Sequence, residues 1–130
     1  MTLSFYPHAG MMLFCDFKGS IDPEINKKRP VIVVSPRLPN RAGLCTIVPT
    51  STTEPRNIQP YQVLLSKNYH PKEKDDVPVW AKCDLVANVS IERLDRFRVS
   101  RAKFIVPKVT AEDLASVRQG VLAALGFPSV

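Results

Sequence analysis

The sequence is organised around Lys27-Lys28-Arg29-Pro30-Val31-Ile32-Val33-Val34-Ser35-Pro36, where a basic triplet runs into an apolar segment bounded by prolines. Consecutive β-branched residues between two prolines predict a short, buried β-strand. Arg29 stands at the start of that strand, with Glu24 five residues upstream. A guanidinium anchored to a rigid strand indicates a place where an anion is bound.

Other short apolar segments on both sides of this one are rich in Val, Ile, Phe and Thr, and the 12 prolines of the chain interrupt it too often for long helices. We therefore predict strands over residues 11–17, 31–35, 44–49, 61–65, 79–85 and 97–99. Five or six short strands indicate a small β-barrel. One amphipathic helix is expected at the end, because Thr110 is a suitable N-cap and apolar residues recur at helical spacing at Leu114, Val117, Val121 and Leu125.

A chain of 130 residues is long enough for one hydrophobic core, so a single domain over residues 1–130 is expected. The formal charge of +6 favours an anionic partner without requiring one. Cys15, Cys45 and Cys83 are far apart and flanked by apolar residues, which indicates buried, reduced thiols. We predict no metal site, no cofactor, no membrane span and a cytoplasmic location.

Polar side chains follow several of the predicted strands. The turn Thr50-Ser51-Thr52-Thr53 supplies hydroxyls that either satisfy the backbone of their own turn, which is the commoner case, or hold a phosphate. Lys82 and Asp84 are two residues apart on a predicted strand, so they are expected to share one face, either as a simple pair or beside a phosphate. Trp80 joins that face as a core residue or as a platform for an unstacked base. A cationic run follows at Arg93, Arg96, Arg98, Arg101 and Lys103.

These residue types suit the cleavage of RNA without a metal ion. In that reaction the 2'-hydroxyl attacks the adjacent phosphodiester, which requires a base, an acid and a cation for the developing charge. Arg29 is suited to clamping the phosphorane, and Glu24 or Asp84 to accepting the 2'-hydroxyl proton. DNA lacks the 2'-hydroxyl and would be spared.

The remaining polar candidates have supporting roles in this hypothesis. Lys82 would share the electrostatic work, and the hydroxyl of Ser51 or Thr52 would orient the non-bridging oxygens. Lys27 and Lys28 would steer the RNA toward the site.

The chain resembles the MazF/PemK/Kid toxins of type II toxin-antitoxin systems. The resemblance rests on four segments in the order of the family: Gly10-Met11-Met12-Leu13-Phe14-Cys15-Asp16-Phe17, Arg29-Pro30-Val31-Ile32-Val33-Val34-Ser35-Pro36, Ile47-Val48-Pro49-Thr50-Ser51-Thr52-Thr53 and Lys82-Cys83-Asp84. It implies a mainly β fold, an SH3-like β-barrel of the CcdB/MazF type with a C-terminal α-helix, that assembles as a homodimer. It also implies a metal-independent, sequence-selective endoribonuclease that cleaves single-stranded mRNA and is silenced by a cognate antitoxin protein.

The resemblance also assigns roles to individual residues. Arg29 matches the catalytic arginine of the family, and Glu24 matches the contributing glutamate five residues before it. Thr52 is favoured over its neighbour as the site hydroxyl, although the turn is longer than the usual Pro-x-Thr. Lys82 and Asp84 stand where some members carry an arginine and an aspartate, so the bidentate fork of that arginine is lost here.

Two other functions fit the same fold. The related CcdB toxins share the barrel but inhibit DNA gyrase by binding, through residues of the C-terminal helix. Retention of Arg29 and Glu24 argues against that function, because a gyrase inhibitor has no use for the pair. The third candidate is a barrel that has lost catalysis and only binds RNA or an antitoxin.

Overall fold

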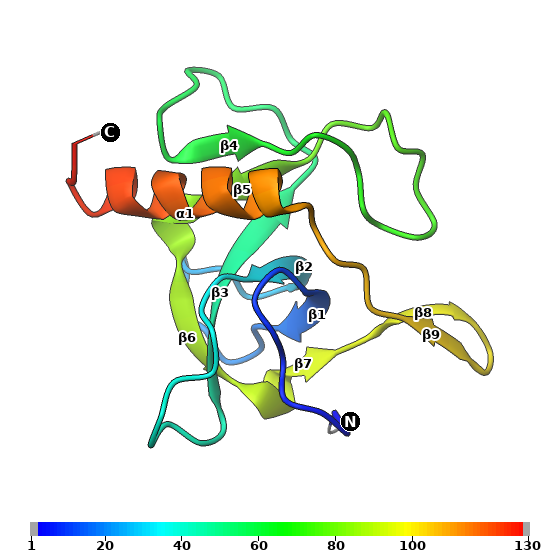
Figure 1. Cartoon of the computed structure of the whole chain (residues 1–130). Helices are drawn as coiled ribbons and strands as arrows, with labels where there is room; N and C mark the ends of the chain where they lie inside the picture. The colour runs from blue at the N-terminus through cyan, green and yellow to red at the C-terminus, as the bar shows by residue number, and fades with distance from the viewer. Residues whose placement is uncertain (1–2, 129–130) are drawn as a thin grey trace.

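The computed structural model describes residues 3–128 (Figure 1). The strands are β1 (Met12–Asp16), β2 (Lys28–Val33), β3 (Leu44–Ser51), β4 (Gln62–Leu64), β5 (Trp80–Lys82), β6 (Ala87–Ser90), β7 (Leu94–Asp95), β8 (Phe97–Ser100) and β9 (Lys103–Ile105). Short 3-10 turns, η1 (Cys83–Leu85) and η2 (Ile91–Arg93), lie on either side of β6, and the helix α1 (Ala111–Ala124) follows β9. The fold is therefore mainly β with a C-terminal helix, as the sequence predicts.

The main sheet is antiparallel and is centred on β3. Its strands lie in the order β4-β5-β3-β2-β1-β7, and β6 pairs with β3 beside this path. The first half of β3 pairs with β6 and its last two residues, Thr50 and Ser51, pair with β5, while β2 covers the opposite edge. The two end strands of this order, β4 and β7, do not pair with each other within residues 3–128. The sheet is therefore an open barrel.

Both faces of β1, β2 and β3 are buried. Alternate residues of a strand point to opposite faces, and in β2 Ile32 joins one apolar cluster while Val31 and Val33 join the other. The first cluster lies under α1 and includes Val117, and the second includes Leu13 of β1. This double burial explains why β2 has a continuous apolar sequence instead of an alternating one.

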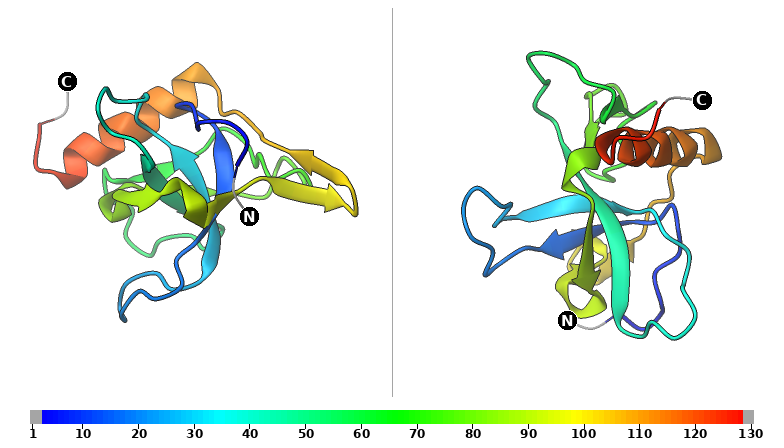
Figure 2. Two further views of the ribbon diagram at one scale, coloured as in Figure 1. Left: turned by 90° about the horizontal axis from the view of Figure 1, so that it is seen from below. Right: turned by 90° about the vertical axis from the view of Figure 1, so that its left-hand side faces the viewer.

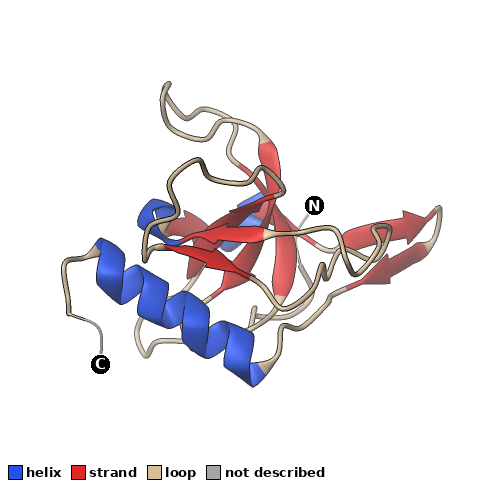
Figure 3. Ribbon diagram, turned by 90° about the horizontal axis from the view of Figure 1, so that it is seen from above, coloured by secondary structure: helices blue, strands red, loops and turns tan. Residues whose placement is uncertain are grey.

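Helix α1 begins where its sequence predicts, and Val117 of the predicted apolar stripe is buried, whereas Leu125 is the C-cap residue and is exposed. The side chain of Thr110 accepts a hydrogen bond from the Asp113 backbone N–H at 3.1 Å, which confirms the predicted N-cap. The helix lies across β4 and η1 (Figures 1 and 3). Gly120 faces η1 so closely that an added Cβ would lie 2.6 Å from the Cys83 sulfur.

The hairpin of β8 and β9 forms a separate two-stranded sheet that projects from the body of the molecule (Figure 2). It carries most of the cationic run, including Arg98, Arg101 and Lys103. None of the helices in residues 3–128 is long and apolar enough to cross a membrane.

Some strand boundaries differ from those predicted. Strand β2 begins at Lys28, so Arg29 is part of the strand, and β3 continues through Thr50 and Ser51. The segment 79–85 is a strand only as far as Lys82, because the Cys83 N–H donates to the carbonyl of Tyr61 and the chain then turns into η1. The prediction that Lys82 and Asp84 share one strand face is therefore wrong, since Asp84 lies in η1.

Candidate functional site

Arg29 lines a pocket of about 130 Å³. It is formed by the beginning of β2, the end of β3 and the connection between β4 and β5. Its lining residues are Met12, Arg29, Pro30, Thr50, Ser51, Thr52, Asn68, His70, Glu73 and Val79. The structure thus brings together Arg29, Ser51 and Thr52, three of the residues that the sequence suggested for catalysis.

Arg29 is held by its strand and carries an unsatisfied donor. Its backbone lies opposite Cys15 of β1 in the antiparallel ladder. Its Nε is buried and has no hydrogen-bond acceptor among residues 3–128. Buried N–H groups nearly always have a partner in native proteins, so this one is available to a bound anion.

The hydroxyls at the end of β3 have different roles. Thr50 donates to the carbonyl of Pro30 at 2.9 Å, which links β3 to β2. The Ser51 oxygen accepts from the Thr53 N–H at 3.1 Å and satisfies its own turn. Thr52 is exposed, and its side chain makes no hydrogen bond within the described part of the chain. Of the two hydroxyls proposed for the site, Thr52 is the freer to contact a ligand.

The connection between β4 and β5 supplies site residues that the sequence did not indicate. Asn68, His70 and Glu73 all line the Arg29 pocket. The His70 ring packs edge-on against Phe14 and Phe97, and its Nδ1 accepts a hydrogen bond from the Lys72 N–H at 3.1 Å. The atom left for a ligand is therefore Nε2, which carries the proton in the neutral ring.

This connection is attached to the start of α1 by a buried carboxylate. Asp113 is only 7% exposed and accepts hydrogen bonds from the Tyr69 hydroxyl at 2.6 Å and from the Ser66 hydroxyl at 2.7 Å. The Tyr69 oxygen in turn accepts from the Thr110 N–H at 3.1 Å. These contacts hold the beginning of the connection against the helix, which places Asn68 and His70 beside Arg29.

Glu24 and Asp84, the two carboxylates suggested by the sequence, line a different pocket of about 280 Å³. Glu24 accepts a hydrogen bond from the Ile21 N–H at 2.7 Å and so stabilises its own turn. The ion pairs within residues 3–128 are Lys67 with Asp75 and Arg96 with Asp95. The expected pairing of Arg29 with Glu24 is not among them, because the two side chains lie in separate pockets.

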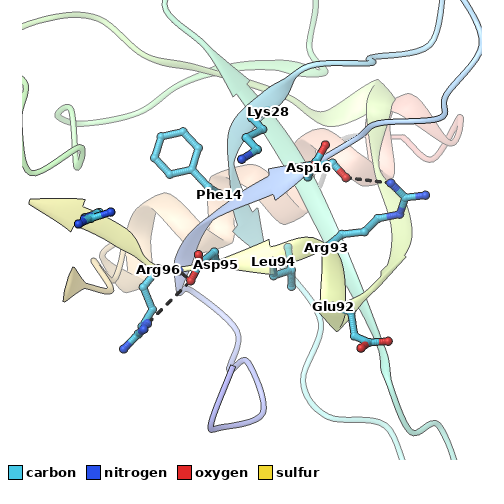
Figure 4. Close-up of a pocket in the computed structure, with 9 residues that line it drawn as sticks. Phe14, Asp16, Lys28, Glu92, Arg93, Leu94, Asp95 and Arg96 are labelled. Atoms are coloured by element: carbon cyan, nitrogen blue, oxygen red, sulfur yellow. Dashed lines mark hydrogen bonds and ion pairs between the residues drawn. The ribbon is translucent and has the colours of Figure 1, made fainter. Parts of the chain in front are cut away.

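A larger groove has a volume of about 340 Å³, and Figure 4 shows the residues that line it. Phe14 lines this groove, and its ring centroid is 5.8 Å from that of His70 in the Arg29 pocket. Charged side chains from β1, β2 and the segment that runs from η2 to β8 line the groove, namely Asp16, Lys28, Glu92, Arg93, Asp95, Arg96 and Arg98. The groove therefore carries four cations against three carboxylates.

One arginine of the groove, Arg93, forms hydrogen bonds to the backbone. Arg93 donates to the backbone carbonyls of Asp16 and Lys18, both at 2.9 Å. Lys28 has no ion-pair partner within residues 3–128, so its charge is available at the junction of β2 and the groove.

The other residues proposed to contact RNA line neither the Arg29 pocket nor the neighbouring groove. Trp80 is 6% exposed and belongs to the core, so its ring is not accessible as a stacking platform; the alternative interpretation, a core tryptophan, describes it correctly. Lys82 is half-buried on β5, opposite Gln62 of β4. Lys27 is exposed just before β2.

The three cysteines are buried and free of disulfides, as predicted. Burial raises the pKa of Cys15 and Cys83 to about 12 and that of Cys45 to about 11. Thiols with such pKa values stay protonated and do not serve as nucleophiles.

Known structures share this fold over nearly their whole length. MazF from Deinococcus radiodurans has a TM-score of 0.69 at 22% identity, with 95% of this chain and 100% of that chain aligned. An endoribonuclease from a mycobacterial species, solved in complex with its cognate antitoxin, has a TM-score of 0.65 at 19% identity and covers 96% of this chain and 100% of its own.

Sequence comparison gives a full-length relative and a family. The uncharacterized protein YifN of Escherichia coli (strain K12) is 28% identical over 156 aligned positions, which cover 100% of this chain and 99% of YifN. The model of the PemK-like, MazF-like toxins of type II toxin-antitoxin systems matches residues 8–125. Together with an antiparallel open barrel that carries an arginine pocket at the start of β2, this match shows that the chain belongs to the PemK-like, MazF-like toxin family of type II toxin-antitoxin systems.

Proposed function

We propose that the protein is an endoribonuclease that cleaves single-stranded RNA at the Arg29 pocket. The observation that carries this proposal is the buried, unpartnered Nε of Arg29 in a pocket that also contains the hydroxyls of Ser51 and Thr52. Guanidinium and hydroxyl donors are the groups that bind a phosphodiester. The arginine corresponds to the catalytic arginine that the family resemblance implies.

In the proposed reaction the 2'-oxygen of one ribose forms a bond to the adjacent phosphorus while the bond from phosphorus to the 5'-oxygen breaks. The 2'-hydroxyl proton passes to a carboxylate, and the departing 5'-oxygen takes a proton from water. Arg29 stabilises the extra negative charge on the phosphorane, with Thr52 donating to a non-bridging oxygen. The protein side chains supply the base and the cation, so we expect the reaction to proceed without a metal ion.

Glu73 is our candidate for the base, because it is the carboxylate that lines the pocket of Arg29. The candidates chosen from the sequence, Glu24 and Asp84, are the alternative, and they line the second pocket. A general base must lie within hydrogen-bond reach of the proton that it removes, which favours the carboxylate on the same side as the arginine.

The groove next to the pocket is suited to the flanking nucleotides. A cavity of about 130 Å³ is small beside the roughly 300–1,000 Å³ of common ligand pockets, so it accommodates a phosphate rather than a whole nucleotide. The neighbouring groove contributes Lys28 and Arg98, and the projecting hairpin continues the basic surface. We propose that the RNA strand follows these charges.

The proposal is tested with purified protein and a labelled single-stranded RNA in EDTA. We expect cleavage by the wild type that leaves a 2',3'-cyclic phosphate, and no cleavage by Arg29→Ala. Absence of EDTA-resistant cleavage would sink the enzyme assignment. A gyrase supercoiling assay run in parallel would support the CcdB-like function if the protein inhibited gyrase.

We also propose that the protein acts in the cytoplasm as a homodimer and is silenced by a cognate antitoxin. The resemblance to the family supports the dimer. Structures of MazE-MazF from Deinococcus radiodurans, one with a TM-score of 0.64 to this chain, support an antitoxin partner. Sedimentation at micromolar concentration should give the mass of two chains, and a purely monomeric species would remove the dimer from the proposal.

A further inference from the structure

Asn68 is a buried polar residue that neither the fold nor the proposed reaction accounts for fully. It is 3% exposed and lines the Arg29 pocket, and its Nδ2 has no hydrogen-bond acceptor in the described part of the chain. A buried amide N–H without an acceptor is unfavourable, because the group has lost its hydrogen bonds to water. Buried polar groups in native proteins nearly always have a partner, so this free donor is available to a ligand.

The orientation of the Asn68 amide is determined by its other end. The Asn68 Oδ1 accepts a hydrogen bond from the His70 backbone N–H at 2.9 Å. The Asn68 backbone N–H donates to the carbonyl of Asp75, also at 2.9 Å. Because the Asn68 Oδ1 already accepts the hydrogen bond from His70, the Nδ2 is the side-chain atom left to face the pocket.

Two residues that line this small cavity therefore each carry a buried, unpartnered donor, Asn68 at Nδ2 and Arg29 at Nε. They come from different elements, the loop after β4 and the strand β2, and neither has a protein acceptor within residues 3–128. A pair of donors without an acceptor is complementary to an anion that offers several acceptor oxygens. The exposed Glu73 lines the same cavity, so a bound anion must be held strongly enough to offset that charge.

We propose that Asn68 is a second phosphate-binding residue of this site, which donates from Nδ2 to a non-bridging oxygen of the phosphate that Arg29 holds. This inference rests on the proposed function, because it assigns the phosphate of RNA to the Arg29 pocket. The Arg29 guanidinium supplies the charge, and the Asn68 amide sets the orientation of the phosphate. Asn68 thereby makes the loop after β4 part of the substrate site.

The experiment uses inorganic phosphate as the probe, so that its outcome does not depend on RNA cleavage. In a ¹⁵N NMR titration of the wild-type protein we expect the side-chain amide of Asn68 and the Nε–H of Arg29 to shift together, with one dissociation constant. This measurement needs no variant and is unaffected by folding defects. A wild-type titration in which the Asn68 amide does not move overturns the inference.

The variant Asn68→Asp retains an oxygen for the His70 N–H but replaces the free donor with a carboxylate oxygen. We expect it to weaken phosphate binding, and kcat/KM for RNA, about tenfold or more. Asn88→Asp is the matched control, because the Asn88 Oδ1 also accepts a hydrogen bond, from Thr46, and Asn88 lines a pocket apart from the site. Equal phosphate affinity of Asn68→Asp and the wild type refutes the assignment. Phosphate binding through Asn68 in a protein that cleaves no RNA would support the phosphate-binding role of Asn68 and refute the proposed function.

Discussion

Arg29 combines a rigid backbone with a free guanidinium. The strand ladder holds its main chain opposite Cys15, and its Nε is buried without an acceptor among residues 3–128. A lysine at this position keeps the charge but loses the planar fork that contacts two phosphate oxygens at once. We predict that Arg29→Lys lowers kcat/KM for RNA by roughly tenfold or more.

The control for this prediction is Arg41→Lys, at an exposed arginine of the loop before β3 that lines a different cavity. It should leave the cleavage rate unchanged. Cleavage by Arg29→Lys at the wild-type rate would remove Arg29 from the phosphate-binding role.

Three carboxylates are candidates for the general base, and they lie in two different pockets. Glu73 lines the Arg29 pocket, whereas Glu24 and Asp84 line the second pocket. We predict that Glu73→Gln reduces kcat by about 10²-fold or more, since general base catalysis contributes that much, and that Glu24→Gln and Asp84→Asn have smaller effects. Single-turnover kinetics of the three variants would decide the assignment, and a larger loss in Asp84→Asn would return the base to the second pocket.

The connection between β4 and β5 depends on α1 for its position. The Tyr69 hydroxyl donates to Asp113 and accepts from the Thr110 N–H, so one oxygen joins the loop to the helix N-terminus. We predict that Tyr69→Phe lowers the free energy of unfolding by about 1–3 kcal/mol, because a buried carboxylate and an N–H both lose a partner. Urea unfolding measures this, with Tyr61→Phe as the control. Weaker phosphate binding by Tyr69→Phe, and not by the control, is expected because the same loop carries Asn68.

Gly120 sets how closely α1 approaches the sheet. An alanine in a helix interior is ordinarily about 1 kcal/mol more favourable than a glycine. Here the added Cβ would lie 2.6 Å from the Cys83 sulfur and 2.9 Å from the Val63 side chain. We predict that Gly120→Ala destabilises the protein by about 1–3 kcal/mol despite its better helix propensity. Thermal unfolding should show a lower Tm for Gly120→Ala and an unchanged or higher Tm for Ser116→Ala on the exposed face; a higher Tm for Gly120→Ala would show that the helix can move outward at little cost.

At the scale of the whole molecule, the buried thiols make stability depend on pH. Burial raises the pKa of all three cysteines from 9.0 to about 11 or 12 in the folded state. Above pH 9 the unfolded chain releases thiol protons that the folded chain retains, so the free energy of unfolding falls as pH rises. The thiol contribution is therefore fully present below pH 9 and is lost between pH 9 and about 12.

We predict a lower urea midpoint at pH 10 than at pH 8, and a smaller decrease in Cys45→Ala, which keeps two of the three thiols. A pH dependence that is unchanged by this substitution would assign the decrease to other groups. The thiols should also resist a thiol reagent in the folded protein and react once it unfolds.

Much of the fold could be predicted because its signals are local. The apolar segments of β1 and β3 and the N-cap of α1 at Thr110 depend on neighbouring residues in the chain. The strands that were not predicted, β6, β7 and β9, are short and have no strong periodicity of their own. Strand β7, for example, is two residues long and exists because Leu94 and Asp95 pair with β1.

The amino-acid sequence alone was enough to place Arg29 at the start of a buried strand, because β-branched residues and prolines act on the backbone next to them. Which polar residues surround Arg29 followed from the tertiary structure. Asn68 and Glu73 lie in its pocket because Asp113, 47 residues from Ser66 in the sequence, holds their loop against α1. Glu24 is only five residues from Arg29 in the chain and yet lines another pocket, since its side chain stabilises a turn that directs it away.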